Sequence, residues 1–132
     1  PPPRENLIYK TAIKLAEAYR VPPQGQIILH KNLPLGSGIG GGSADAAATI
    51  KGLARLWSLP EEPNRLQKIA LELGADVPAC LVRRPVWAEG IGEKMTRMPE
   101  MPDMFFVLVN PGTPVMTHNV FKRFGDKFTP PL

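Results

Sequence analysis

A glycine-rich stretch, "PLGSGIGGGSADAAA" at residues 34–48, constrains the fold more than any other part of the sequence. Five of the seven residues 36–42 are glycine, and the chain then turns at once to alanine, a strong helix former. Glycines let a backbone curl tightly and approach a ligand without side-chain clashes. The first turn of a helix leaves N–H groups unpaired, and the helix dipole makes that end positive. We therefore interpret the stretch as a phosphate-binding loop at a helix N-terminus.

Two polar residues beside the loop fit this interpretation. Ser43 stands near the start of the helix, where its hydroxyl would cap the helix or bind a phosphate or its metal ion. Lys31 lies just upstream and would add positive charge. The structural alternative is a flexible hairpin or linker. We favour it less, because linkers are seldom followed at once by a well-patterned helix.

The better-known phosphate loops do not match. A Walker A loop ends in Gly-Lys-Ser or Gly-Lys-Thr, whereas Gly42 is followed by Ser43 and Ala44. A protein-kinase loop requires a hairpin and then a Val-Ala-Ile-Lys strand, and neither is visible in the sequence.

The dinucleotide-binding fingerprint matches in its letters alone. Gly36, Gly38 and Gly41 have the required spacing, and Glu61 falls near the distance expected for the acid that binds a ribose. That acid should end a second strand, but Glu61 lies beside prolines at the start of a helix. Pro34 also intrudes between the preceding strand and the first glycine.

Composition restricts the class of protein. The chain is 43% hydrophobic, which suffices for a buried core, and its net charge of +4 comes without a Lys/Arg run interleaved with aromatic residues. Nucleic acid is therefore not an expected partner. Cys80 is the one cysteine, and we expect a small buried hydrophobe in a reducing compartment. No signal peptide or membrane-spanning stretch is visible, so no membrane partner and a cytoplasmic location are expected.

Periodicity predicts mostly helices in the first half of the chain. Asn6 is a plausible N-cap for a helix over residues 6–20, and "QIILHK" at 26–31 is typical of a strand. A second helix begins at Ser43. A third, with acids in its first turn, opens at Pro60 or Pro63 and stops at Gly74. The apolar stripe predicted for the second helix is Ala46, Ala47, Ile50, Leu53, Ala54 and Trp57.

The second half is predicted to be richer in strands. "ADVPACLV" at 75–82 indicates a turn into a short buried strand, and "VWAEGIGEKM" at 86–95 a strand that reaches a glycine bend. Residues 104–109 form the clearest strand pattern, and a short helix with Thr117 as its cap follows. This order favours an α+β fold with a change of domain near "RMPEMPDM".

Several segments together resemble the GHMP kinases (relatives of galactokinase, homoserine kinase, mevalonate kinase and phosphomevalonate kinase). "LPLGSGIGGGSADAAA" resembles their second motif, and "ENLIYKTA", "LGADVPACL", "AEGIGEKM" and "PGTPVMTHNVFKRF" also fit, in order, over nearly the whole chain. The resemblance implies the two-domain α+β GHMP-kinase fold, which joins a ribosomal protein S5 domain 2-like part to a ferredoxin-like part. Residues 1–98 would belong to the N-terminal ATP-binding domain and 99–132 would start the C-terminal domain.

The resemblance also implies an activity. Among the GHMP kinases, the sequence most resembles those that transfer the γ-phosphate of ATP to the 2-hydroxyl of a cytidine-diphosphate-linked methylerythritol in non-mevalonate isoprenoid biosynthesis. Mg²⁺ is expected as well, because phosphoryl transfer requires it, and Ser43 is the only modest candidate ligand. Asp76 would match the catalytic aspartate, and Phe121 would lie near the cytosine side of the substrate. The residues expected to wrap the ATP phosphates are Pro34, Leu35, Gly36, Ser37, Gly38, Ile39, Gly40, Gly41, Gly42, Ser43 and Ala44.

The chain departs from the family pattern in three places. The lysine-bearing first motif upstream of "ENLIYKTA" and the third glycine-rich motif are not in this sequence. We therefore expect an internal fragment that is inactive alone. Ala44 stands where a second serine is common, which would remove one phosphate contact.

Two other function classes stay open on the sequence alone. A dinucleotide-binding oxidoreductase domain would require a parallel βαβ unit around residues 26–62, and a non-catalytic module would retain nucleotide binding without turnover. Asp76, judged without the family, is more typical of a turn or helix cap than of a catalytic base. Four further polar residues, His30, Glu89, Glu93 and His118, are expected to be structural or solvated.

Overall fold

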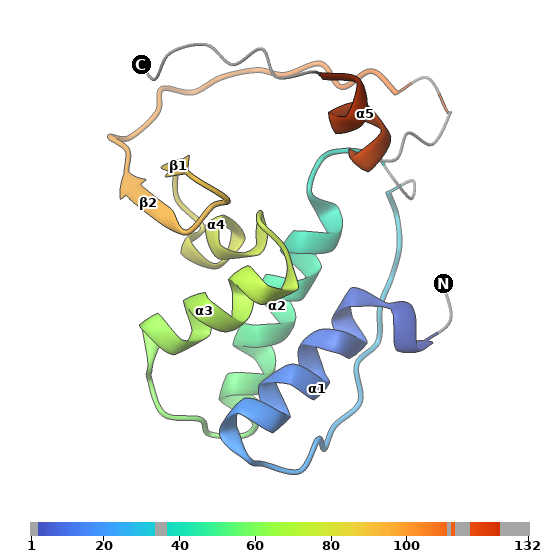
Figure 1. Cartoon of the computed structure of the whole chain (residues 1–132), viewed down its shortest axis with the longest axis vertical. Coiled ribbons are helices and arrows are strands. Elements are labelled where there is room, and N and C mark those ends of the chain that lie inside the picture. Colours follow the sequence, from blue (N-terminus) through green and yellow to red (C-terminus); the bar gives the residue numbers. More distant parts are fainter. Residues whose placement is uncertain (1–2, 34–36, 111, 113–116, 125–132) are drawn as a thin grey trace.

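Helices dominate the computed structural model, which describes residues 3–33, 37–110, 112 and 117–124. Figure 1 shows α2 passing through the centre, with α1 on one side and α3 and α4 on the other. In chain order, the elements are a short 3-10 turn Pro3–Glu5, α1 Leu7–Tyr19, α2 Gly41–Leu56, α3 Pro63–Leu73, α4 Val77–Val82, β1 Val86–Glu89, β2 Lys94–Arg97 and α5 Thr117–Phe124. No helix within these ranges is both long enough and apolar enough to cross a membrane.

Helix α1 starts where its cap predicts. The Asn6 side-chain Oδ1 accepts a hydrogen bond of 3.0 Å from the Ile8 N–H, which satisfies one of the donors left free at the helix N-terminus. The helix ends where Arg20 adopts a left-handed φ of 54°. The helix predicted over residues 6–20, with Asn6 as its cap, is confirmed.

Helix α2 starts two residues earlier than predicted. Gly40 occupies the N-cap position with a φ of 71°, a left-handed conformation that favours glycine. Ser43 is therefore the third residue of the helix, and no side chain caps α2 within the described part of the chain. Of the two roles expected for Ser43, capping this helix is wrong, and binding of a phosphate or its metal ion stays a prediction.

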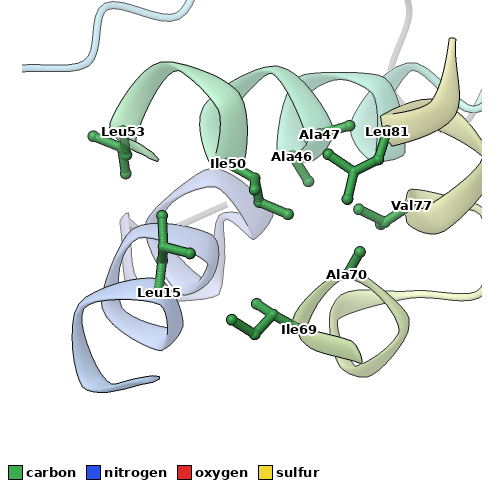
Figure 2. Packing of buried hydrophobic residues seen from close by; sticks show 9 residues of the cluster. All are labelled: Leu15, Ala46, Ala47, Ile50, Leu53, Ile69, Ala70, Val77 and Leu81. Carbon is green, nitrogen blue, oxygen red and sulfur yellow. The ribbon is translucent and has the colours of Figure 1, made fainter. Parts of the chain in front are cut away.

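One hydrophobic core joins the four helices α1 to α4, and Figure 2 shows its side chains pointing toward one another. Four of the six residues predicted for the stripe of α2 are buried, while Ala54 and Trp57 are only partly buried. Small alanine side chains on α2 allow the neighbouring helices to approach closely. The buried core residues are Leu15, Ala46, Ala47, Ile50, Leu53, Ile69, Ala70, Val77 and Leu81.

Residues 77–82 form a helix, α4, and the predicted buried strand is wrong. An apolar run of this length fits either a buried helix or a buried strand by its pattern alone. Pro78 lies at the start of the helix, where its missing N–H has no intrahelical partner to lose. Val77, Pro78 and Leu81 are buried, consistent with one face of a helix packed on the core.

Helix α3 begins at Pro63, which is one of the two positions predicted for its start. The predicted acids, Glu61 and Glu62, precede the helix instead of lying in its first turn. Gly74 ends the helix as expected, with extended backbone and its N–H donating to the Ala70 carbonyl oxygen at 3.2 Å.

The predicted strand and glycine bend at residues 86–95 form an antiparallel hairpin. β1 pairs with β2 in a register that places Val86 opposite Arg97 and Glu89 opposite Lys94. Gly90 and Gly92 both have positive φ, at 68° and 96°, within the turn that joins the strands. Helices and a small antiparallel sheet together confirm the α+β class.

The two remaining predicted strands, 26–31 and 104–109, are wrong. Both segments are largely exposed and belong to no strand. A strand requires a neighbouring segment to complete its ladder of hydrogen bonds, and the hairpin is the one ladder in the described part of the chain. The parallel βαβ unit around 26–62 is therefore missing there as well, which argues against the dinucleotide-binding alternative.

The segment between α1 and α2 is held at both ends of α2. The Trp57 indole Nε1–H donates to the Gln24 carbonyl oxygen at 2.7 Å, just beyond the C-terminus of α2. Lys31 forms an ion pair with Asp45 near the N-terminus of the same helix. The segment therefore passes antiparallel to α2 and delivers the chain to the glycine-rich loop (Figure 1).

Candidate functional site

A cavity of about 660 Å³ opens in front of the N-terminus of α2. Its lining comes from four parts of the chain: the start of α1, the segment before the loop, the loop with the first turns of α2, and the turn between α3 and α4. The lining residues are Leu7, His30, Lys31, Asn32, Leu33, Ser37, Gly38, Gly40, Gly41, Gly42, Ser43, Asp45 and Asp76.

Free backbone donors face this region at the start of α2. The first helical hydrogen bond runs from the Ala44 N–H to the Gly40 carbonyl oxygen at 2.9 Å. The N–H groups of Gly41, Gly42 and Ser43 find no backbone acceptor among the described residues. Three free donors at the positive end of a 16-residue helix form a favourable environment for an anion.

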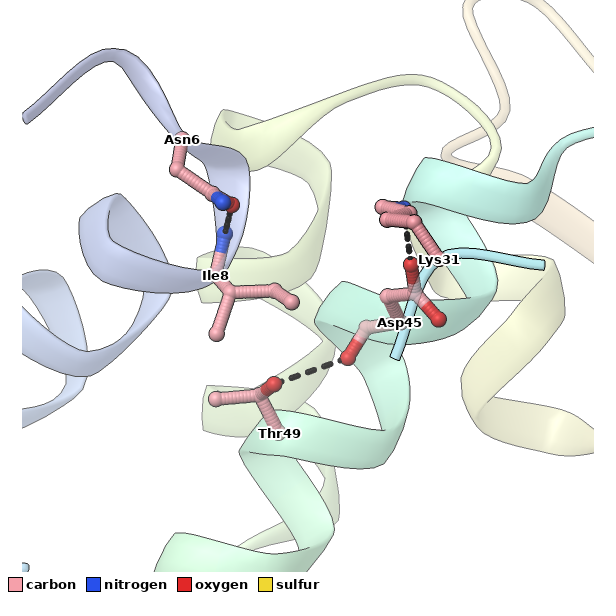
Figure 3. Close-up of polar contacts among 5 residues, drawn as sticks. All are labelled: Asn6, Ile8, Lys31, Asp45 and Thr49. Carbon is pink, nitrogen blue, oxygen red and sulfur yellow. Dashed lines mark hydrogen bonds and ion pairs between the residues drawn. The ribbon is translucent and has the colours of Figure 1, made fainter. Parts of the chain in front are cut away.

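The predicted extra positive charge of Lys31 is already paired. Figure 3 shows its side chain reaching from the extended segment to the Asp45 carboxylate on α2. The Asp45 backbone oxygen in turn accepts a hydrogen bond of 2.8 Å from the Thr49 hydroxyl. Both side chains of the pair are partly exposed, so water screens their attraction. Because Lys31 is paired, the backbone N–H groups at the start of α2 are the main unpaired positive groups in the cavity.

Asp76 reaches the cavity from a tight turn. The Val77 N–H donates to the Gly74 carbonyl oxygen at 3.1 Å, and this bond closes a four-residue turn. Asp76 has φ −87° and ψ −15°, values typical of the third residue of a type I turn. Its side chain is exposed and does not cap α4. The turn predicted at this point is present, but Asp76 precedes a helix and not the predicted buried strand.

The negative charge of Asp76 affects the thiol of Cys80, which lies one helical turn away. Burial raises the pKa of the Cys80 thiol, and the nearby Asp76 carboxylate raises it further. Cys80 is a free, half-buried cysteine, so the expectation of a small hydrophobe fits its environment in part. Within the described ranges, no three His, Cys, Asp or Glu side chains are grouped as a metal site.

The structure brings together most of the residues predicted for the site. Seven of the predicted residues line the cavity, namely Ser37, Gly38, Gly40, Gly41, Gly42, Ser43 and Asp76. Ile39 is 48% exposed, and neither it nor Ala44 lines the cavity. Pro34, Leu35 and Gly36 lie outside the described residues. Phe121 belongs to α5, but its side chain also lies outside what the structure describes.

Sequence reasoning missed Asp45. This residue lies two positions after Ser43, and its charge and its place near a helix start were visible in the sequence. Its pairing with Lys31 depends on the path of residues 21–33, which local patterns do not predict. Leu7 was missed for the same reason, because it lines the cavity only through the packing of α1 on α2.

A family comparison agrees with the position of the loop. The family described as "GHMP kinases N terminal domain" matches residues 6–84. The match begins at the cap of α1 and ends just after α4, so it includes the four packed helices and every residue that lines the cavity.

Curated relatives are similar over almost the whole chain. The 4-diphosphocytidyl-2-C-methyl-D-erythritol kinase of Sinorhizobium medicae is 53% identical over 119 residues, which cover 90% of this chain and 39% of the relative. The enzyme of the same name from Mesorhizobium japonicum is 46% identical over 130 residues, or 96% of this chain and 44% of the relative. The chain thus spans less than half the length of these relatives.

A solved structure has the same fold. It is a crystal structure of 4-(cytidine 5'-diphospho)-2C-methyl-D-erythritol kinase, with a TM-score of 0.64 and 40% sequence identity. The superposition covers 74% of this chain and 35% of that chain. The part of this chain that superposes therefore has the fold of a part of that enzyme.

Proposed function

Because the chain belongs to the GHMP kinase family, we propose that it is the ATP-binding part of a kinase that phosphorylates 4-diphosphocytidyl-2-C-methyl-D-erythritol. The relatives and the solved structure that support the substrate are named for this reaction. The observation that supports the chemistry is one cavity lined by both the glycine loop and Asp76. The activity belongs to the whole protein, a small-molecule kinase with an alcohol acceptor.

The glycine loop, residues 34–44, binds the ATP phosphates in this proposal. The free N–H groups of Gly41, Gly42 and Ser43 would donate to phosphate oxygens at the positive end of α2. The absence of side chains at the glycines lets the phosphates approach the backbone. Phosphoryl transfer depends mainly on positioning and on charge stabilisation, both of which such a loop supplies.

Asp76 accepts the proton of the attacking alcohol. The 2-hydroxyl oxygen forms a bond to the γ-phosphorus of ATP, and the bond from that phosphorus to the oxygen of the departing ADP breaks. The hydroxyl proton passes to the Asp76 carboxylate, and the products are ADP and the 2-phosphate of the alcohol. An exposed carboxylate on the wall of the cavity is suited to this role, because it is accessible to substrate and is a group that can accept a proton.

The residues of the cavity fit Mg²⁺ bound mainly by nucleotide. Mg²⁺ prefers oxygen ligands and is often held by one or two protein groups together with substrate phosphates. The Ser43 hydroxyl is not used as a helix cap and lines the cavity, so it would be the protein ligand. Bound Mg²⁺ would neutralise charge on the transferred phosphoryl group.

Two further assignments extend the proposal beyond the cavity. Phe121 and its neighbours on α5 would lie near the cytosine of the substrate. Residues 1–98 would form part of the N-terminal ATP-binding domain, and residues 99–132 would start the C-terminal domain. We expect a small-molecule partner, no nucleic acid or membrane, and a cytoplasmic protein.

The test is turnover by the whole protein with ATP, Mg²⁺ and the diphosphocytidyl alcohol. Wild-type protein should release ADP and form the 2-phosphate. Asp76→Asn keeps the size of the side chain but not its basicity, and should lower kcat by about 10²–10⁴-fold. Asp103→Asn is the matched control, because Asp103 is exposed and does not line the cavity. ATP binding without ADP release by the wild-type protein would support the non-catalytic module instead.

A further inference from the structure

The hairpin turn contacts the turn that presents Asp76. A Cβ atom added to Gly92 would lie 2.5 Å from the Ala75 carbonyl oxygen, a distance that real Cβ atoms do not tolerate. This is a contact between two backbones, so no side-chain rotation can relieve it. Gly92 also has a φ of +96°, which residues with a side chain rarely adopt. The hairpin can therefore approach Ala75 this closely only with glycine at this position.

The contacted atom belongs to the peptide unit that joins Ala75 to Asp76. A displacement of the Ala75 oxygen that rotates this peptide plane changes φ of Asp76, which is −87°. The Gly74–Val77 hydrogen bond holds the same turn from the other side. The direction of the Asp76 side chain therefore depends on the hairpin as well as on its own turn.

Gly92 does not line the cavity of the glycine loop itself. It lines a separate cavity between α3, α4 and the hairpin, whereas Asp76 lines the cavity of the glycine loop. The backbone contact with Ala75 is the route by which Gly92 would affect the reaction.

Two hydrogen bonds within the hairpin turn stabilise its conformation. The Gly92 N–H donates to the Glu89 carbonyl oxygen at 3.1 Å, and the Ile91 N–H donates to the Glu93 carboxylate at 2.7 Å. Hydrogen bonds from the Glu93 and Ile91 backbones hold the pKa of the Glu93 carboxyl below its usual value, so the acceptor stays ionised.

We propose that Gly92 is a positioning residue, which holds the peptide before Asp76 so that its carboxylate faces the phosphate cavity. The inference rests on the proposed function, because it assumes that Asp76 accepts the substrate proton. The proposal gives the hairpin turn "EGIGE", residues 89–93, an indirect part in the reaction. None of these residues lines the cavity of the glycine loop.

The experiment compares Gly92→Ala with Gly90→Ala in the whole protein. Both glycines lie in the same turn with positive φ, but a Cβ on Gly90 meets only the flexible end of the Glu93 side chain. Gly92→Ala should lower kcat by about 10- to 100-fold, because small misplacements of reacting groups are this costly, while the KM for ATP stays within about twofold. Gly90→Ala should lower kcat by no more than about threefold, because the atoms nearest to its Cβ belong to the Glu93 carboxylate, which can move aside. Equal effects of the two variants, or a normal kcat for Gly92→Ala, would overturn the proposal.

A double-mutant cycle shows whether the effect passes through Asp76. In an Asp76→Asn protein, Gly92→Ala should lower kcat no further, because the group that it displaces has already lost its basicity. A slow Asp76→Asn protein in which Gly92→Ala still has its full effect would overturn the positioning role and leave the proposed function intact. A near-normal rate for Asp76→Asn alone would instead refute the base role, and with it the premise of the inference.

A second variant covers the case in which Gly92→Ala does not fold. Glu93→Ala removes the carboxylate that fixes the Ile91 N–H and adds no atoms. It should lower kcat by about threefold, since it loosens the support without displacing Ala75, and the loss should vanish in the Asp76→Asn protein. An unchanged kcat in Glu93→Ala would then overturn the proposal.

Discussion

The Lys31 ammonium and the Asp45 carboxylate form an ion pair that joins the segment before the glycine loop to the second turn of α2. The two residues are 14 positions apart and lie on the two sides of the loop. Their pairing brings both ends of the loop together in front of the free N–H groups of α2. It also places a negative charge inside a cavity whose proposed ligand is itself negative.

Removing that negative charge should strengthen ATP binding. Asp45→Asn leaves Lys31 unpaired beside the phosphates, and the dissociation constant for ATP should fall by about two- to fivefold, since exposed charge pairs are worth about 0.2–1 kcal/mol. Lys31→Gln should shift it in the opposite direction. Calorimetric titrations at low and high salt provide the measurement, because screening should shrink both effects. Weaker binding of Mg²⁺–ATP by Asp45→Asn would show that Asp45 is a metal ligand, contrary to this prediction.

A side chain at Gly41 should block phosphate binding. Gly41 has ordinary helical backbone, and a Cβ there meets only the Leu33 side chain at 3.7 Å, so Gly41→Val should fold. ATP affinity should fall by about 10- to 100-fold, because hydrogen bonds to charged groups are worth about 1.5–3 kcal/mol and valine hinders their formation. Gly40→Val is a less clear test, since its positive φ would strain any side chain.

The matched control for the loop is Gly52→Val. Gly52 lies in the same helix, and its Cβ would point into open space. Its ATP affinity should equal that of wild type, as measured by the same titration. If Gly41→Val is folded and binds ATP normally, the loop does not bind phosphate in the way proposed.

The end of α1 depends on a residue of α3. The Arg65 guanidinium lies 4.3 Å from the centre of the Tyr19 ring and donates hydrogen bonds to the Ala18 carbonyl oxygen and to Glu62. Arg65→Ala should therefore lower the free energy of unfolding by about 1–2 kcal/mol, the sum of a partly exposed cation–π contact and a lost hydrogen bond. Denaturant unfolding measures the change. Lys68→Ala, an exposed position on the same helix, should change stability by less than about 0.5 kcal/mol, and an equal loss in both variants would contradict the prediction.

Cys80 should report the charge of Asp76. Because burial and the Asp76 carboxylate raise the pKa of the thiol, Asp76→Asn should lower that pKa, and alkylation of the single cysteine should speed up near pH 8. The raised pKa means that the folded state holds the proton more tightly than the unfolded state. Its contribution to stability is thus complete below about pH 8.5, the unfolded value, and is lost as the pH rises through the folded value. Cys80→Ala should reduce this alkaline loss, and an unchanged pH profile would contradict the assignment.

Structural features that depend on only a few neighbouring residues were predictable from the sequence. Asn6 as a cap and the glycine bend at 90–92 follow from local backbone chemistry, and both are present. Residues 77–82 were not predictable, because a six-residue apolar run has no period that separates a helix from a strand. The segments 26–31 and 104–109 have strand composition, but strand formation also requires a partner ladder.

The candidate site likewise has a part that was predictable from the sequence and a part that was not. The loop was visible because it concentrates glycine before a helix, and its donors depend only on the start of α2. The pairing of Lys31 with Asp45 and the approach of Gly92 to Ala75 join residues at least 14 positions apart. Such contacts result from the packing of whole elements, and no local pattern indicates them.

The run of apolar residues at 105–109 should make the 132-residue chain associate. Phe105, Phe106, Val107, Leu108 and Val109 are between 75% and 101% exposed, and the segment is extended without a partner strand in the described residues. An exposed apolar run of high strand propensity is a template for pairing with other chains. Light scattering after size exclusion should therefore show oligomers whose population grows with protein concentration.

Charged substitutions within that run test the cause. Phe106→Lys together with Leu108→Lys should shift the chain toward monomer, because two charges on one face oppose pairing with another copy. Met101→Lys with Met104→Lys adds the same charge at half-exposed positions outside the run and should leave association largely unchanged. Circular dichroism should show that both double variants keep the helices of the core. Association that is equally reduced in the two variants would assign the effect to net charge, and a wild-type chain that stays monomeric at all concentrations would contradict the prediction itself.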